Sequence, residues 1–465
     1  MKRILHVLLF VLVAVAVEAQ QAKFVFYFIG DGMGVNQVNA TEMYLAERQG
    51  KIGIEPLLFP SFPVASFATT YSASNSVTDS AAGGTALATG VKTYNGAIGV
   101  DADKNPVETI AEKAKKAGRK VGVTTSVSVD HATPSSFYAH QPNRSWSYEI
   151  ALEIPRAGFD FYAGSGFLKP ATTADKKSAP SIFPIFEEAG YTVARGMNDY
   201  KEKAAGAKKM ILIQPEGADV SSLPYAIDRK EGDLTLAEIT ASAIEFLSKD
   251  NKKGFFLMVE GGKIDWSCHG NDAATTMEEV VDFDNAIKVA YEFYKKHPKE
   301  TLIVVTADHE TGGLSMGTAG YTLKLKALAS QKQSQDLLSR AITDLRRSEK
   351  VTWEQAKALL AEKMGFWTSI PLTWEQERML RDEFETSFVK RKVVFEETLY
   401  AKTEPLAVAA KRIMSQVAKL GWSTTGHSAG YVPVFAVGAG SKLFVGKLDN
   451  TDIPKHIAKA AGYKW

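Results

Sequence analysis

Apolar segments that alternate with helical patterns limit the folds open to this 465-residue chain more than any other feature of its sequence. The segments that we interpret as strands are Lys23 to Ile29, Val64 to Thr69, Lys120 to Thr125, Lys209 to Ile213, Gly254 to Val259, Thr301 to Thr306 and Val432 to Val437. Helical periodicity between them is clearest over Pro106 to Ala117, Leu236 to Ser248 and Ala273 to Lys296. Such a pattern is typical of an α/β fold with a largely parallel central sheet and helices on both faces.

The segment from Tyr321 to Leu420 has a different composition. It holds a single glycine, Gly365, although the chain has 36. Its amphipathic patterns predict helices, for example at Thr352 to Lys363 and Thr373 to Glu385. The simplest interpretation of its charges is a solvated helix surface; covering an active site or making a subunit contact is the alternative. We expect a helical insertion at 321–420 within an α/β domain formed by residues 20–320 and 421–465.

The first 19 residues have the pattern of a secretory signal peptide. Lys2 and Arg3 precede an apolar run from Ile4 to Val17, and the ending at Ala19 fits a small-residue cleavage site. A membrane anchor is the alternative, but the run is shorter than the ~20 residues needed to span a bilayer. We therefore expect a periplasmic or secreted protein without a membrane span after cleavage.

The net charge of +2, from 55 basic and 53 acidic residues, argues against a nucleic-acid-binding protein that relies on a broad basic field. Any affinity for phosphate must therefore be local. In the stretch from Thr78 to Gly90, Asp79, Ser80 and a run of small residues predict a helix start, whose unpaired N–H groups favour an anion. Ser80 is placed there to attack or hold a phosphate; an ordinary Asp or Ser N-cap is the alternative.

Polar side chains that can bind metals follow four of the predicted strands. They are Asp31, His131 with Thr133, Glu260, and Asp308 with His309. Ligands of open α/β sheets bind at the carboxyl ends of the strands, so we expect these groups to converge. Asp265 and His269 are four residues apart, which puts both on one face of a helix, and His427 precedes the last strand. Nitrogen and oxygen ligands without thiolates suit zinc, magnesium, manganese or cobalt.

Other residues near these motifs are interpreted as structural. His140, His297 and His456 have no acidic partner at a useful spacing along the sequence. Cys268 is interpreted as a small buried residue, and as the only cysteine it excludes an internal disulfide. Packing and function are equally good interpretations of Trp266.

Six motifs stand out in chain order. They are Asp31-Gly32-Met33-Gly34, Thr78 to Ala86, His131-Ala132-Thr133-Pro134 with Ala139-His140 and Arg144, Val259-Glu260-Gly261 to Asp265 and His269, Thr306 to Glu310, and Thr425-Gly426-His427. Their residues and their order resemble those of the alkaline phosphatase family. The chain resembles this family over residues 24–320 and 421–440, and the insertion falls where the family has its variable crown-like region.

The resemblance implies two Zn²⁺ ions and one Mg²⁺ ion. One zinc would be held by Asp265, His269 and His427, the second by Asp31, Asp308 and His309 with Ser80 on its substrate side, and the magnesium by Asp31, Thr133 and Glu260. In the best-known bacterial members, an Asp and a Lys occupy the positions of His131 and Trp266. The His and Trp pair resembles other branches of the family, so His131 contacts the third metal or only its water shell, and Co²⁺ or a water-bridged Mg²⁺ is the alternative there.

The resemblance also implies the activity, which is hydrolysis of phosphate monoesters through a phosphoserine at Ser80, with Arg144 as the phosphate clamp. Family members are commonly homodimers. Within enzymes, the alternative is a phosphodiesterase or nucleotide phosphatase of the same superfamily; a sulfatase is disfavoured because the sequence has no C-x-P-x-R or S-x-P-x-R motif. From another class, the alternative is a secreted phosphate- or metal-binding protein without turnover.

Overall fold

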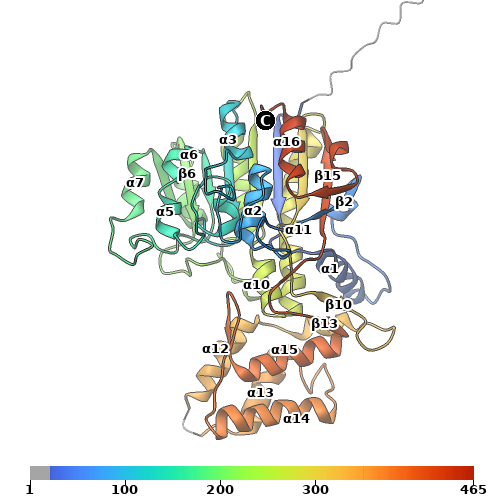
Figure 1. Cartoon of the computed structure of the whole chain (residues 1–465). Helices are drawn as coiled ribbons and strands as arrows, with labels where there is room; N and C mark the ends of the chain where they lie inside the picture. The colour runs from blue at the N-terminus through green and yellow to red at the C-terminus, as the bar shows by residue number, and fades with distance from the viewer. Residues whose placement is uncertain (1–20, 349) are drawn as a thin grey trace, which may run out of the picture.

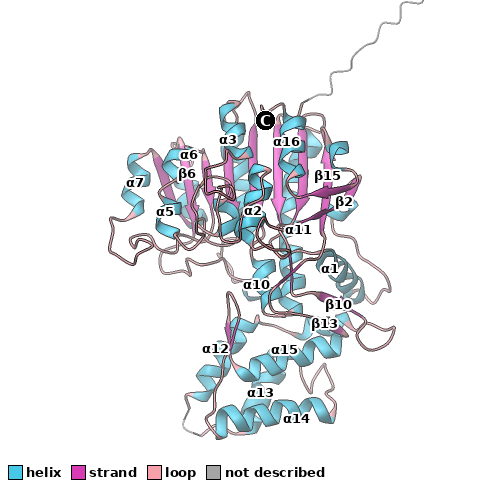
Figure 2. Ribbon diagram, in the orientation of Figure 1, coloured by secondary structure: helices cyan, strands magenta, loops and turns pink. Residues whose placement is uncertain are grey.

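The computed structural model describes residues 21–348 and 350–465 and is built around a ten-stranded sheet (Figures 1 and 2). The strand order is β16-β2-β15-β8-β1-β7-β3-β4-β6-β5. The strands are β1 (Phe24–Ile29), β2 (Val64–Thr69), β3 (Lys120–Thr125), β4 (Phe161–Ala163), β5 (Tyr191–Arg195), β6 (Lys209–Ile213), β7 (Phe255–Glu260), β8 (Thr301–Thr306), β15 (Val432–Gly438) and β16 (Lys447–Asp449). All seven predicted strands are present within one residue of their predicted bounds, while β4, β5 and β16 were not predicted. The predicted signal peptide, residues 1–19, lies outside the described residues.

Helices cover both faces of the sheet, as the sequence predicts. The helices of the α/β part are α1 (Val35–Arg48), α2 (Ser80–Thr89), α3 (Ile110–Lys116), α4 (Ala132–Ser135), α5 (Ser147–Ala151), α6 (Ile154–Ala157), α7 (Ile182–Glu188), α8 (Gly196–Lys203), α9 (Leu236–Ser248), α10 (Lys263–His269), α11 (Ala273–Lys296) and α16 (Asp452–Ala461). The prediction for α3 began too early, because Thr109 and Glu112 form a capping box that starts the helix at Ile110. Among the described residues, none of the helices combines the length and apolar character needed to cross a bilayer.

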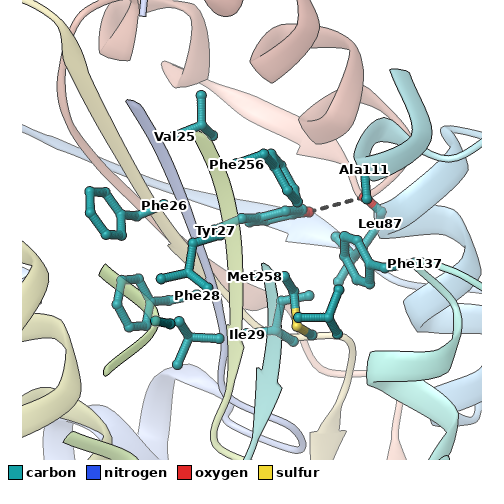
Figure 3. Packing of buried hydrophobic residues seen from close by; sticks show 14 of the residues in the cluster. Val25, Phe26, Tyr27, Phe28, Ile29, Leu87, Ala111, Phe137, Phe256 and Met258 are labelled. Atoms are coloured by element: carbon teal, nitrogen blue, oxygen red, sulfur yellow. Dashed lines mark hydrogen bonds between the residues drawn. The ribbon is translucent and has the colours of Figure 1, made fainter. Parts of the chain in front are cut away.

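The packing of the central strand β1 explains why its apolar residues do not alternate with polar ones. Tyr27 points toward α2, where its hydroxyl donates to the carbonyl of Leu87 at 3.3 Å (Figure 3). On the opposite side, Phe26 and Phe28 pack their rings against Phe293 and Phe283 of α11, with centroids 5.6 and 5.9 Å apart. Both faces of the strand are therefore buried, and each residue loses apolar surface to a helix.

One strand of the sheet, β15, is antiparallel to both of its neighbours, β2 and β8. The other neighbouring strands pair in parallel. Because β15 runs in the opposite direction, its first residue lies at the edge where the parallel strands end. The segment before β15 therefore reaches the same edge as the residues that follow β1, β7 and β8.

The helices after residue 330 form a layer with its own hydrophobic cluster, shown in orange below the sheet in Figure 1. They are α12 (Gln335–Arg346), α13 (Trp353–Met364), α14 (Trp374–Phe384) and α15 (Pro405–Ala418). The two helices predicted in this segment are present, and each begins with a capping box, from Thr352 and from Thr373. The cluster also includes side chains of α1 and α11, so this layer packs on helices next to the carboxyl edge of the sheet.

Three pairs of short strands complete the structure around this edge. They are β9 (Glu310–Thr311) with β14 (His427–Ser428), β10 (Leu314–Met316) with β13 (Leu420–Trp422), and β11 (Glu396–Glu397) with β12 (Lys402–Thr403). The pairing of His427 with Thr311 brings the segment before β15 next to the residues that follow β8.

Candidate metal and phosphate site

The predicted ligands converge at the carboxyl edge of the sheet. Asp31 follows β1, Glu260 ends β7, Asp308 and His309 follow β8, and Asp265 and His269 lie on α10. Three groups of side chains bring ligand atoms within 4.8 Å of one another: Asp265 with His269 and His427, Asp31 with Asp265 and His309, and Asp31 with His131 and Glu260. Asp308 joins the second group, with its Oδ2 3.4 Å from His309 Nε2. Thr133 joins the third, because its hydroxyl donates to Asp31 Oδ2 at 3.3 Å.

Three histidines present the same nitrogen to the centre. The Nδ1 of His427 lies 2.8 Å from the carbonyl oxygen of Thr78, and the Nδ1 of His269 lies 2.5 Å from that of Thr425. The Nδ1 of His309 lies 3.2 Å from the Thr311 hydroxyl, which itself donates to Asp265. Each Nδ1 therefore donates to an oxygen, which leaves the Nε2 lone pairs facing inward. Metal-binding histidines in proteins are oriented by this kind of hydrogen bond.

The carboxylates of the site are buried and crowded. Burial, together with the nearby carboxylates, raises the pKa of Asp31 and of Asp308 well above the usual value. Burial raises the pKa of Glu260 to about 7. Burial acts in the same sense on Asp265, but His269, and then His427 and His309, outweigh it and lower the pKa of that carboxyl.

The chemistry of these residues fits divalent cations. Among the described residues, four buried ligand atoms have no hydrogen-bond partner: Asp31 Oδ1, Glu260 Oε1, Asp265 Oδ2 and His131 Nδ1. Leaving such groups buried and unpaired costs free energy, which a cation bound between them would offset. Nitrogen and oxygen donors without sulfur match zinc and magnesium.

Ser80 is the first residue of α2 and lies beside these groups. Asp79 caps the helix, because its Oδ1 accepts from the backbone N–H groups of Ala82 and Gly96 at 3.0 and 3.1 Å. The predicted helix start is therefore confirmed, and Asp79 is the N-cap. The buried hydroxyl of Ser80 lies 3.1 Å from His309 Nε2. The hydroxyl thus lies at the positive end of a helix and next to the potential metal ligands.

Two glycines allow the segments of the site to approach closely. Gly32 has φ +72°, and a Cβ there would lie 2.8 Å from the Cα of Asp265. Gly83 lies in the first turn of α2, where a Cβ would lie 2.9 Å from the carbonyl oxygen of Asp308. Any larger side chain would push these segments apart, so the small-residue motifs serve packing at the site.

Arg144 extends over this site from the loop before α5. Its Nη1 donates to Asp79 Oδ2 at 3.0 Å, and its side chain is 20% exposed. Its Nη2 lies 3.3 Å from His131 Nε2 and donates to the hydroxyl of Tyr400 at 2.7 Å. Burial and the nearby Arg144 lower the pKa of His131 to about 3, so that ring is neutral.

Two residues of the site were missed by sequence reasoning. Tyr400 comes from the turn between β11 and β12, 256 residues after Arg144 in the chain, and no local pattern marks it. Thr311 follows the Asp308-His309-Glu310 motif directly, and this position was a signal that could have found it. Cys268 is fully buried, as expected, and burial raises the pKa of its thiol.

The interpretation of His140 as a histidine without an acidic partner was wrong. Its Nε2 lies 3.5 Å from Glu112, and its Nδ1 lies 3.5 Å from Glu153. Burial alone would lower its pKa, but the two carboxylates outweigh it and raise the pKa to about 10. These partners come from α3 and from the segment before α6, so only the folded chain brings them to His140.

The His140 cluster predicts a pH-dependent contribution to stability. A histidine whose pKa is higher in the folded state stabilises the fold below its unfolded pKa of ~6.5, and this contribution is lost as the pH rises through the folded value. We expect His140→Gln to lower the unfolding temperature clearly at pH 6 and much less above pH ~10. Thermal unfolding at both pH values checks this, with the half-buried His297→Gln as the matched control. An equal decrease of the unfolding temperature at both pH values would contradict a stabilising ion pair at His140.

Comparisons with known proteins agree with this geometry. A family model described as alkaline phosphatase matches residues 22–161 and 216–463. The chain is 34% identical to alkaline phosphatase 3 of Bacillus subtilis over 453 residues, which is 95% of this chain and 90% of that protein. It is similar to the crystal structure of a cold-active alkaline phosphatase from Shewanella sp., with 31% identity, a TM-score of 0.78 and coverage of 94% and 99% of the two chains. It is also similar to a variant of the alkaline phosphatase TAB5 that has Mg bound in its M3 site, with 29% identity, a TM-score of 0.67 and coverage of 96% and 100%.

Proposed function

Since the chain belongs to the alkaline phosphatase family, we propose that it hydrolyses phosphate monoesters through a covalent phosphoserine on Ser80. Family membership supports a phosphatase; the bound metals and the roles of particular residues are part of the proposal. The observation that carries it is the convergence of Ser80, Arg144 and three groups of potential metal ligands at one edge of the sheet.

The ligand groups correspond to three ions. We assign Asp265, His269 and His427 to one Zn²⁺; Asp31, Asp308, His309 and Ser80 to the second; and Asp31, Thr133 and Glu260 to Mg²⁺, with His131 at its edge. Such ions, when bound, neutralise phosphoryl oxygens and make oxygen nucleophiles reactive at neutral pH. A TAB5 variant in which a histidine is replaced by glutamate has Mg bound in its M3 site, which supports a third metal position in the family.

The residues of the chain then carry the reaction in two displacements. Ser80 Oγ loses its proton and forms a bond to phosphorus while the bond to the ester oxygen breaks, and the departing oxygen takes up a proton to leave as the alcohol. A water molecule next loses a proton and attacks phosphorus, the bond to Ser80 breaks, Ser80 Oγ is protonated again and inorganic phosphate leaves. The N-terminal N–H groups of α2 favour the negative charge of the phosphoryl group in both steps.

Arg144 is the proposed phosphate clamp. The guanidinium is anchored to Asp79, the residue next to Ser80, at 3.0 Å. The contacts with Asp79 and Tyr400 use one N–H of Nη1 and one of Nη2, which leaves further N–H groups of the guanidinium to bind phosphoryl oxygens bidentately. Asp79 therefore has two roles, because it caps α2 below Ser80 and orients Arg144 above it.

The proposal also covers the location, domain organisation and assembly of the enzyme. The residues 1–19 fit a secretory signal, so we place the protein in the periplasm or outside the cell. We assign residues 20–320 and 421–465 to the catalytic domain and residues 321–420 to an insertion. A homodimer is the assembly that we expect from the family resemblance.

The proposal is tested by assaying the purified protein, loaded with zinc and magnesium, on an aryl phosphate monoester and on a bis-aryl phosphate. We expect phosphate release from the monoester with a much higher kcat/KM than for the diester. Metal analysis of the same sample should give zinc and magnesium. Binding of metal or phosphate without release of phosphate would replace the proposal with that of a binding protein, and a faster diester reaction would indicate a phosphodiesterase.

Arg144→Ala is expected to lower kcat/KM for the monoester by roughly 10- to 100-fold, because charge-assisted hydrogen bonds contribute about 1.5–3 kcal/mol. Steady-state kinetics on an aryl phosphate measures the loss. Arg156→Ala, at an exposed position of α6, is the matched control and should leave kcat/KM unchanged. Equal values for the two variants would remove Arg144 from the clamp role.

A further inference from the structure

One side chain of the insertion, that of Tyr400, lies in the proposed active site. The strands β11 and β12 form a short hairpin, seen in Figure 2 above α12, and Tyr400 lies in its turn. The ring of Tyr400 stacks on Trp266 of α10, with centroids 4.6 Å apart and planes at 11°. It also meets His269 edge-on, with centroids 5.4 Å apart and planes at 73°. Aromatic stacking thus holds the ring between the insertion and the helix that carries Asp265 and His269.

The hydroxyl of Tyr400 is bonded to the proposed phosphate clamp. It accepts a hydrogen bond from Arg144 Nη2 at 2.7 Å and lies 3.2 Å from His131 Nε2. Asp79 holds the other terminal nitrogen, Nη1, at 3.0 Å. The guanidinium is therefore fixed at both ends, by the residue next to Ser80 and by a residue of the insertion.

Ion pairs fix the hairpin on the body of the insertion. The buried Lys411 of α15 binds Glu396 of β11 at 2.6 Å. Glu404 follows β12 directly and is buried. It forms an ion pair with Arg346 of α12 and accepts hydrogen bonds from the N-terminal N–H groups of α15. The position of Tyr400 is thus set by the packing of α12 and α15, and loop geometry alone does not determine it.

We propose that Tyr400 is a positioning residue that holds Arg144 in the orientation that binds phosphate, so that the insertion completes the phosphate site. This inference rests on the proposed function of Arg144. Without the Tyr400 hydroxyl, Nη2 keeps only the longer contact with His131 Nε2, at 3.3 Å. The guanidinium is then less well ordered, and ordering it on phosphate binding costs side-chain entropy. With Nη2 also held by Tyr400, less of this cost falls on the binding step.

Tyr400→Phe separates the hydroxyl from the ring, because phenylalanine keeps the stacking on Trp266. In the zinc- and magnesium-loaded enzyme, we expect inorganic phosphate to bind about tenfold more weakly, with KM for an aryl phosphate raised by a similar factor and kcat changed less. Isothermal titration with inorganic phosphate measures the binding directly. Tyr321→Phe, at a fully exposed tyrosine of the same segment, is the matched control and should bind phosphate as the wild type does.

A double-mutant cycle tests whether Tyr400 acts through Arg144. If it does, Tyr400→Phe should change kcat/KM in the wild-type background and have no further effect in the Arg144→Ala background. Equal effects in both backgrounds, or wild-type phosphate binding in the single variant, would overturn the inference. These results differ from failure of the proposed function, in which the wild-type holoenzyme itself releases no phosphate.

Discussion

Ser80→Ala is expected to reduce kcat on a phosphate monoester by roughly 10³-fold or more while the protein keeps its metals. Loss of a serine nucleophile removes the covalent route, and the activity that remains comes from binding and electrostatics alone. The hydroxyl lies 3.1 Å from His309 Nε2 and begins α2 at its positive end. The variant keeps the carboxylates and histidines that we assign to the metals. Its turnover should therefore fall while its metal content stays at the wild-type level.

Two measurements on the variant and one on a control protein decide this. Steady-state kinetics gives kcat, metal analysis gives the zinc and magnesium content, and the matched control Ser74→Ala, at an exposed serine of the preceding loop, should show wild-type kcat. Near-normal turnover in Ser80→Ala would remove this serine from the nucleophile role. A chiral phosphate gives an independent check, since two in-line displacements retain configuration at phosphorus and a single displacement inverts it.

The sheet and its helices could be predicted because the signal is local. The buried strand Phe24–Ile29 and its neighbours are continuous apolar runs, and helices between the strands carry caps such as Thr109 and Thr235. Three strands of the ten-stranded sheet were not predicted because their local signal is weak. Phe161–Ala163 and Lys447–Asp449 have three residues each, too few for a pattern, and Tyr191–Arg195 at the edge of the sheet is only partly buried.

The ligand residues could be expected to converge because they follow parallel strands, and parallel strands end at one edge of a sheet. His427 is different, since it precedes a strand and would lie at the far edge if that strand were parallel. It reaches the site because β15 is antiparallel to β2 and β8. Strand direction is set by tertiary packing. The sequence therefore offers His427 only as a candidate third ligand, the family resemblance assigns it to a zinc, and the antiparallel strand is the physical reason why it reaches the site.

The contacts of Tyr400 and His140 could not be predicted from the sequence. Tyr400 reaches Arg144 only because α12 and α15 hold the hairpin at the edge of the sheet, and His140 meets Glu112 and Glu153 only in the folded chain. Contacts of this kind join side chains whose separation in sequence carries no periodic signal. They depend on how the helices pack, which local patterns leave open.

Removing the metals should abolish activity and also lower the unfolding temperature by several degrees. Asp31, Asp308, Glu260 and Asp265 are buried within one centre, and burial with mutual repulsion raises the pKa of the first three. Divalent cations bound to the folded state stabilise it in proportion to the logarithm of their concentration over Kd. Loss of their charge stabilisation should also lower kcat by roughly 10³-fold or more, since Lewis-acid catalysis contributes several kcal/mol.

Chelation followed by selective reloading makes this test specific. After dialysis against a chelator, metal analysis should show an empty protein, and thermal unfolding and an aryl phosphate assay should both show the loss. Zinc with magnesium should restore both readouts, whereas calcium should not restore activity, because the histidine nitrogens of His269, His309 and His427 suit zinc and calcium prefers oxygen ligands. Because Asp265 belongs to the first and second ligand groups and Asp31 to the second and third, the two readouts should recover together as metal is added. Unchanged stability and turnover in the metal-free protein would mean that these buried carboxylates and histidines have another partner, and the assignment of the whole centre would then be wrong.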